Sequence, residues 1–203
     1  LSRVVLADDT IQYYRPDKLI SRVEKPDGSV DEYIYDTQAR LIQVKSTQPN
    51  GTIIWQNVLT GEIKTQQPDG TIVRQSTTGG MTVELPDGSK QIFDPQGRLI
   101  KTEIFENAVK TIATYEYVGT QVTITARLEN GTLKFREIRS LGDDMKYGTD
   151  DDVVLSYEAP GYTQTTAMVA GKIRVTHIEQ VDSQTGIVTT IDYDYVTVPR
   201  QVT

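Results

Sequence analysis

The sequence predicts an all-β protein: an antiparallel meander of short hairpins that forms an elongated, twisted sheet, either a single layer or a spiral. Turn motifs, most of them containing glycine, recur every 9 to 12 residues between residues 28 and 142, and many segments between them alternate apolar with polar residues. Only 37% of the 203 residues are hydrophobic, which is little for a thick sandwich core. Elongated repeat proteins tolerate this, because each unit packs only on its neighbours.

Four copies of one turn punctuate the first half of the chain. Proline, then Asp or Asn, then Gly stand at residues 26–28, 49–51, 68–70 and 86–88. Proline presets φ at the second position of such a turn, and glycine takes the position with positive φ. The runs that follow, such as 52–55, are rich in the β-branched and aromatic residues that favour strands.

Residues 101–115 are open to two interpretations. Ile104, Ala108 and Ile112 could share one face of an amphipathic helix. Glu106-Asn107, however, stands where the ten-residue rhythm requires a turn. The rhythm favours a hairpin, and the helix is kept as the alternative.

The change of pattern near Gly142 predicts three parts. A hairpin array covers 1–142, an acidic loop covers 143–152, and a C-terminal β segment covers 153–203. The last segment, 187–198, is long and β-prone. An exposed edge of that kind invites pairing with a strand of another chain.

Composition excludes several classes of function. A net charge of −7 argues against nucleic acid and anionic lipid as partners, because both require basic surfaces. Cysteine is absent, so disulfides and zinc–thiolate sites are excluded. No apolar run is long enough for a membrane span. Because residue 1 is Leu, we expect a processed product or an excised fragment.

A longer repeat accompanies the turns. The segment 35–42, Tyr-Asp-Thr-Gln-Ala-Arg-Leu-Ile, recurs as Phe-Asp-Pro-Gln-Gly-Arg-Leu-Ile at 93–100, each downstream of a Pro-Asp-Gly-Ser turn. With Tyr33-Ile34-Tyr35-Asp36, these motifs resemble the YD-repeat or Rhs-repeat family over about residues 15–120. The resemblance implies hairpins wound into an extended or spiralling sheet, and a secreted or surface protein, bacterial in origin. Within the motif, Asp36 should accept backbone hydrogen bonds and pair with Arg40.

The segment 142–154 carries five aspartates within ten residues. Calcium prefers six to eight oxygen ligands from a loop that can fold around it. Asp143, Asp144, Asp150 and Asp152 are the predicted ligands, while Asp151 points away. The alternative is a solvated acidic turn without an ion. No other cofactor is predicted.

Catalysis is not expected. His177 is the only histidine, and no nucleophile-elbow motif accompanies it. A glycosidase needs two facing carboxylates in an aromatic-lined groove, and aromatic residues make up only 7% of the chain. Asn50-Gly51-Thr52 and Asn130-Gly131-Thr132 match the glycosylation sequon, but Asn-Gly is also a common hairpin turn.

These observations predict a non-catalytic extracellular structural protein that assembles with itself through exposed strand edges into a filament or surface layer. One alternative is a surface adhesion or glycan-binding module, in which Tyr33, Tyr35 and Trp55 form a platform if they share a face. Cross-strand aromatic packing is the simpler role for those three. A second alternative is a fragment of an Rhs-like toxin shell.

Overall fold

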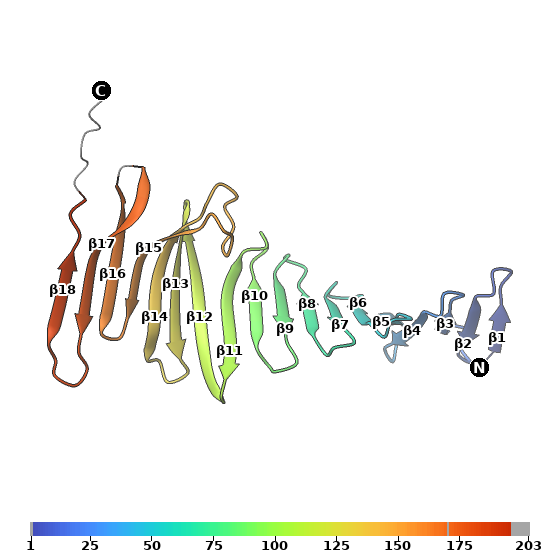
Figure 1. Ribbon diagram of the computed structural model, residues 1–203. Helices are drawn as coiled ribbons and strands as arrows, with labels where there is room; N and C mark the ends of the chain where they lie inside the picture. The colour runs from blue at the N-terminus through green and yellow to red at the C-terminus, as the bar shows by residue number, and fades with distance from the viewer. Residues whose placement is uncertain (1, 170, 196–203) are drawn as a thin grey trace, which may run out of the picture. The chain divides into compact units, whose positions relative to one another are not determined.

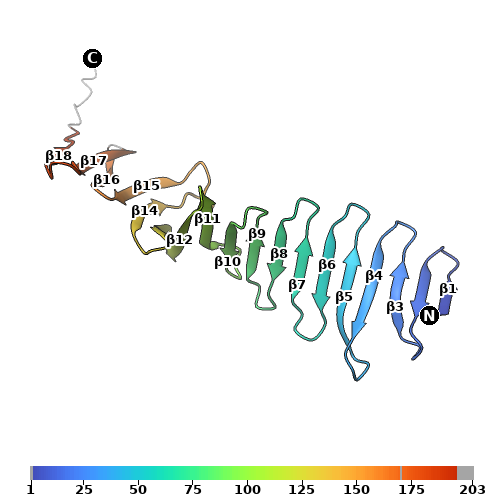
Figure 2. The same ribbon diagram turned by 90° about the horizontal axis from the view of Figure 1, so that it is seen from below.

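The computed structural model describes residues 2–169 and 171–195, which contain 18 strands and no helix (Figure 1). The chain divides into two compact units, Leu1–Gly97 (unit 1) and Arg98–Thr203 (unit 2). Each unit is a single-layer sheet whose neighbouring strands are antiparallel and follow one another in sequence (Figures 1 and 2). The predicted all-β antiparallel meander is therefore confirmed.

Unit 1 holds ten short strands, of four to seven residues each. They are β1 (Ser2–Val5), β2 (Ile11–Tyr14), β3 (Ile20–Glu24), β4 (Val30–Tyr35), β5 (Leu41–Thr47), β6 (Ile53–Asn57), β7 (Ile63–Gln66), β8 (Ile72–Gln75), β9 (Met81–Glu84) and β10 (Lys90–Phe93).

Unit 2 holds eight strands, and most of them are longer, with up to ten residues. They are β11 (Leu99–Glu106), β12 (Val109–Val118), β13 (Gln121–Leu128), β14 (Leu133–Ser140), β15 (Val153–Ala159), β16 (Tyr162–Val169), β17 (Lys172–Val181) and β18 (Val188–Asp192).

The Pro-Asp-Gly turns of unit 1 share one geometry. In the first of them, Gly28 N–H donates to the Lys25 carbonyl over 2.9 Å, and Gly28 has a φ of 84°. The Asp27 carboxylate accepts from Ser29 N–H over 2.8 Å. These turns join every second pair of strands, so they all lie along one edge of the sheet. They also stack, because a Cβ placed on Gly70 would lie 3.6 Å from Cγ of Pro86 in the next turn.

Unit 1 has almost no apolar core. Val23 is its only buried apolar side chain among the described residues. Contacts between elements within the unit join consecutive strands only. Hydrogen-bonded ladders, stacked turns and cross-strand side-chain pairs therefore carry its stability.

Unit 2 does have a core, on one face of β13. Val122, Ile124 and Ala126 alternate along that strand and are at most 2% exposed. Four partly buried aromatic side chains pack on this cluster: Tyr115, Tyr117, Phe135 and Tyr147. Tyr147 belongs to the loop between β14 and β15, so the acidic loop folds over the sheet and completes the core.

The structure divides into units at Gly97, and the division into parts at residues 142 and 152 stays a prediction. Leu141 is 5% exposed and belongs to the cluster on β13. The ambiguous segment 101–115 forms the hairpin of β11 and β12 rather than the alternative helix. Asn107 and Ala108 both have positive φ there, as a tight hairpin turn requires. The predicted final strand is shorter than expected, because β18 ends at Asp192; residues 196–198 lie outside the described part of the chain.

Candidate functional site

A groove of about 670 Å³ lies on unit 1, over strands β5 to β10. Its floor is a row of side chains that face one another directly across consecutive strands. Trp55 pairs with Lys64, Lys64 with Arg74, and Arg74 with Thr82. Lys45 on β5 and Ile92 on β10 continue the row at its two ends. Because side chains alternate between faces along a strand, paired residues of one row share a face. We call this surface the Trp55 groove.

The central contact of the groove joins Lys64 and Trp55. The Lys64 ammonium lies 4.4 Å from the centroid of the indole ring, in a cation–π contact. Trp55 is half-buried, so one part of the ring packs on the sheet while the rest stays accessible. The lysine thus holds the ring in place and also marks the groove with a positive charge.

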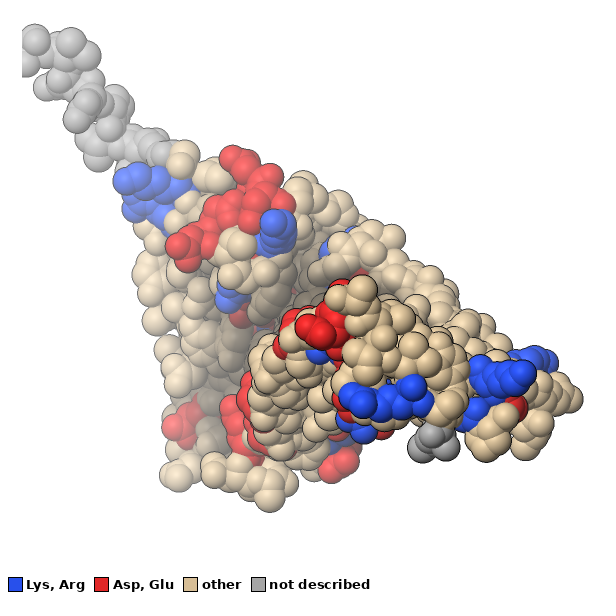
Figure 3. Space-filling model, turned by 90° about the vertical axis from the view of Figure 1, so that its right-hand side faces the viewer, with Lys and Arg blue, Asp and Glu red and all other residues tan. Residues whose placement is uncertain are grey.

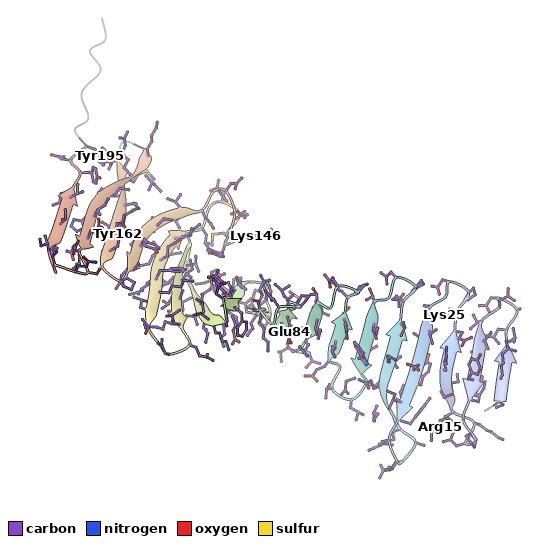
Figure 4. The ribbon with its side chains drawn as sticks, turned by 60° about the horizontal axis from the view of Figure 1, so that its bottom comes forward. Arg15, Lys25, Glu84, Lys146, Tyr162 and Tyr195 are labelled. Atoms are coloured by element: carbon purple, nitrogen blue, oxygen red, sulfur yellow. The ribbon has the colours of Figure 1, made fainter. Side chains whose placement is uncertain are left out.

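Arg74 and Glu84 form the next contact along the groove. Arg74 Nη1 lies 2.9 Å from Glu84 Oε2, and Glu84 projects from β9 (Figure 4). The hydrogen bond from Arg74 holds the pKa of Glu84 below its ordinary value, and the charges of Lys90 and Lys64 act in the same direction. The Arg74 side chain nevertheless remains 48% exposed. The groove therefore presents two cations, Lys64 and Arg74, with Glu84 bonded to Arg74 and Glu62 in the lining.

The molecule's charges are unevenly placed. Asp and Glu side chains gather in several patches on the surface seen in Figure 3, with Lys and Arg side chains beside some of them. In unit 1 many of the aspartates lie in turns, where their carboxylates accept backbone N–H groups; they include Asp8, Asp17, Asp27, Asp36, Asp69, Asp87 and Asp94. The whole chain has a net charge of −7, yet the strands of unit 1 carry cations that include Lys45, Lys64 and Arg74.

The aromatic platform predicted from Tyr33, Tyr35 and Trp55 is not formed. Tyr33 pairs with Val44 and Val44 with Gln56, so Tyr33 lies on the face opposite Trp55. The Tyr35 hydroxyl donates to the Ile20 carbonyl over 2.9 Å, and Arg15 lies over its ring at 5.3 Å. Neither Tyr33 nor Tyr35 lines the groove, and Trp55 alone of the three belongs to it.

The acidic loop uses several carboxylates internally. Asp144 Oδ1 accepts from Lys146 N–H over 2.9 Å, and Asp151 Oδ1 accepts from the Thr149 hydroxyl over 2.6 Å. Asp152 Oδ2 accepts from Gly148 N–H over 2.6 Å, while its Oδ1 is buried and without a hydrogen-bond partner. N–H and hydroxyl groups of the loop itself therefore donate hydrogen bonds to its carboxylates, as in an acidic turn without an ion.

The remaining predicted ligands, Asp143 and Asp150, are exposed. Across residues 2–169 and 171–195, no three acidic or histidine side chains come together in a group that could hold a metal ion. Calcium binding by Asp143, Asp144, Asp150 and Asp152 stays a prediction.

His177 lies on β17, as its sequence context suggested. Its Nδ1 lies 2.7 Å from Asp192 Oδ1, directly across the ladder on β18. The pair joins the last described strand to its neighbour. That the protein is not an enzyme also stays a prediction.

Comparison with known proteins gives structural similarities only. No family model matches the chain, and no curated protein matches it. Among solved structures, the chain is similar to the G-box domain of the microcephaly protein CPAP. The identity is 17%, the similarity covers 97% of this chain and 99% of that one, and the TM-score is 0.43. For that domain, structural analysis suggests a role in centriole elongation. The TCP10 domain of Danio rerio CPAP follows, with 17% identity, 94% coverage of both chains and a TM-score of 0.40. The Drosophila melanogaster SAS-4 TCP domain, in complex with a proline-rich motif of Ana2, shows 15% identity, 68% and 83% coverage, and a TM-score of 0.41.

These findings correct the resemblance to YD-repeat or Rhs-repeat proteins, which is wrong. No family model matches, and the similar solved structures are CPAP and SAS-4 domains. The motif arose from hairpin chemistry: Asp36 accepts from the N–H groups of Gln38 and Arg40, and Arg40 Nε lies 2.7 Å from its carboxylate. Any hairpin with this turn favours those residues.

The functional expectations tied to that resemblance are corrected with it. The proteins to which the chain is similar contradict four of these expectations. They are an extracellular or bacterial surface location, a self-assembling filament or surface layer, an adhesion or glycan-binding module, and a toxin-shell fragment. Within the described residues, no helix could cross a membrane.

Sequence reasoning missed Lys64 and Arg74. Their spacing in the sequence could have identified them. Trp55 and Lys64 lie at equal distances on either side of one turn, and Lys64 and Arg74 lie at equal distances on either side of the next turn. Folding each hairpin about its turn would have aligned all three on one row.

Proposed function

We propose that unit 1 is a protein-binding module that takes an extended segment of a partner protein in the Trp55 groove. The observation that carries the proposal is the groove itself: about 670 Å³ on a sheet whose elements contact only their neighbours within the unit. A half-buried tryptophan beside charged and polar side chains is a common composition for a recognition surface.

A groove of this form suits a chain segment better than a small molecule. It crosses six strands, β5 to β10, and is open along its length. Neighbouring strands lie about 4.8 Å apart, so the groove spans roughly 24 Å, the length of about seven extended residues. Polar side chains at one end, such as Gln43 and Asn57, could bond the backbone of such a segment.

Selection from a random peptide library tests this function, with two variants on adjacent positions of β6. Trp55→Thr removes the ring from the groove. Gln56→Thr also introduces threonine on β6, but on the opposite face of the sheet. Thr is favourable in strands, so both variants should fold. We expect selected peptides to bind the wild type and Gln56→Thr equally, and to bind Trp55→Thr at least tenfold more weakly.

A third variant, Thr82→Tyr, fills the groove without touching Trp55 or adding a charge, and should also abolish binding. Circular dichroism of each variant verifies the fold. Failure to enrich any peptide, or enriched peptides that bind all four proteins alike, would show that the groove is not a binding site.

A further inference from the structure

The second inference concerns the chemistry of the segment in the Trp55 groove, and it rests on the proposed function. Lys64 has no acidic side chain in direct contact, although its charge helps to lower the pKa of Glu84. Across the described residues it forms no ion pair, and its one close partner is the ring of Trp55. The other strand cations of this row are paired: Lys45 lies 2.7 Å from Glu32, and Arg74 lies 2.9 Å from Glu84.

Arg74 has donors to spare. Its ion pair with Glu84 uses Nη1, and a guanidinium carries five N–H donors in a planar fork. The side chain is 48% exposed, so the remaining donors can reach a ligand. Lys64 and Arg74 face each other across β7 and β8, which puts two hydrogen-bonding cations side by side on the groove floor.

The acids of unit 1 cannot readily neutralise this pair. Most of them are held in turns at the sheet edges by backbone N–H groups. Glu84 is already bonded to Arg74, and Glu62, which stands on the rim of the groove, accepts a bond from the Thr60 hydroxyl over 3.2 Å. A ligand carboxylate can accept from Lys64 and from the Arg74 donors that Glu84 does not use.

The spacing fits an extended peptide. Directly opposed residues on neighbouring strands lie about 5 Å apart, whereas alternate side chains of an extended chain lie about 7 Å apart. The long, flexible ends of Lys64 and Arg74 can cover that difference. Beyond Arg74 the groove becomes less charged, with Thr82, Met81 and Ile92 in its lining.

We propose that the Trp55 groove recognises an acidic protein segment, with carboxylates on alternate residues bound by Lys64 and Arg74 and an apolar residue placed toward Ile92. Charge complementarity selects this occupant, because Lys64 forms no ion pair among the described residues and Arg74 has donors that Glu84 does not use. The lysine that covers Trp55 moves onto the ligand carboxylate, and the exposed ring then packs against the peptide.

Fluorescence of Trp55 measures this directly, because it is the only tryptophan of the chain. The probes are three synthetic nonapeptides of one design, with Glu, Gln or Lys at the alternate positions and Leu near the C-terminus. We expect the Glu peptide to bind at least tenfold more tightly than the Gln peptide, and the Lys peptide not to bind. Raising the salt concentration should weaken only the Glu peptide.

Two variants that each remove one positive charge localise the effect. Lys64→Gln should weaken the Glu peptide about tenfold. Lys18→Gln, on an exposed turn between β2 and β3, should change its affinity less than twofold. Equal affinity for the Glu and Gln peptides, or equal losses in the two variants, would overturn the acidic specificity.

The outcomes also separate this inference from the proposed function. If library selection yields Trp55-dependent peptides that lack acidic residues, the binding module stands and the acidic preference fails. If no peptide binds at all, both fail. Tighter binding of a single-stranded oligothymidine, lost in Lys64→Gln, would identify nucleic acid as the occupant and overturn the proposal.

Discussion

The two units solve the same stability problem in different ways. Unit 2 buries a cluster on one face of β13, with Ile124 at 2% exposure, and covers it with Tyr147 from a folded loop. Unit 1 has short strands, a single buried apolar side chain among its described residues, and a row of stacked turns. A sheet therefore needs no buried core where its turns and ladders are regular, and the uncovered face stays available for binding.

Truncation of an apolar side chain should give the largest difference between the units in lost free energy of unfolding. Ile124→Ala in unit 2 should lower the free energy of unfolding by about 2–5 kcal/mol, because it opens a cavity under the loop. Ile54→Ala in unit 1, where the side chain is half-buried, should cost about 1 kcal/mol. Urea unfolding followed by circular dichroism measures both.

Trp55 fluorescence provides the control, since it reports unit 1 alone. Its midpoint should stay unchanged in Ile124→Ala. A matching shift of the fluorescence midpoint would mean that the two units unfold as one, and the contrast between them would be lost.

Disturbing a stacked turn should have the next largest effect, now in unit 1. Gly70 has a φ of 91° and faces Pro86, so Gly70→Ala should cost about 1–2 kcal/mol from backbone strain. Ala39→Gly is the converse variant: Ala39 has a φ of 63°, so glycine should stabilise this turn by a few tenths of a kcal/mol or more. Thermal melts of the two variants should shift in opposite directions, and shifts of the same sign would contradict the strain argument.

The smallest effect concerns an ion-pair cluster in unit 2. Hydrogen bonds from Lys101 and Lys110 lower the pKa of Glu103 from 4.5 to about 2. A lowered carboxyl pKa contributes stability that is present above pH 4.5 and lost as pH falls toward 2. The contribution should be about 1 kcal/mol or less.

Glu103→Gln tests it. The variant should be less stable at pH 7 and should lose less stability than the wild type between pH 5 and pH 2, in urea titrations at a series of pH values. Parallel pH profiles would show that Glu103 contributes nothing of this kind.

Much of the fold was predictable because its determinants are local. Pro, Asp and Gly at 26–28 and 68–70 specify turns by their own backbone and side-chain preferences, and the residues between them had no alternative to strands. The hairpin at Asn107-Ala108 was ambiguous, because Ala rarely adopts positive φ and instead favours helices.

The site was less predictable because it depends on register. Trp55 attracted attention as an aromatic residue, but its partners Lys64 and Arg74 became visible only once three strands were aligned. The packing of Tyr147 on Tyr115, with ring centroids 5.2 Å apart, is a contact between distant segments that no local pattern encodes. The acidic loop therefore drew notice for its charge, while its tyrosine completes the core.

The stacked turns of unit 1 also bear on how such a chain can change length. Two consecutive strands with their turns form a module that returns the chain to the same edge and leaves the same faces in phase. Loss or duplication of one module, for example β7 and β8, would keep every remaining strand in register. Loss of a single strand would instead exchange the two faces of every strand that follows it. Unit 1 can therefore lengthen or shorten its binding surface in steps of one hairpin, a freedom that the looped-over core denies to unit 2.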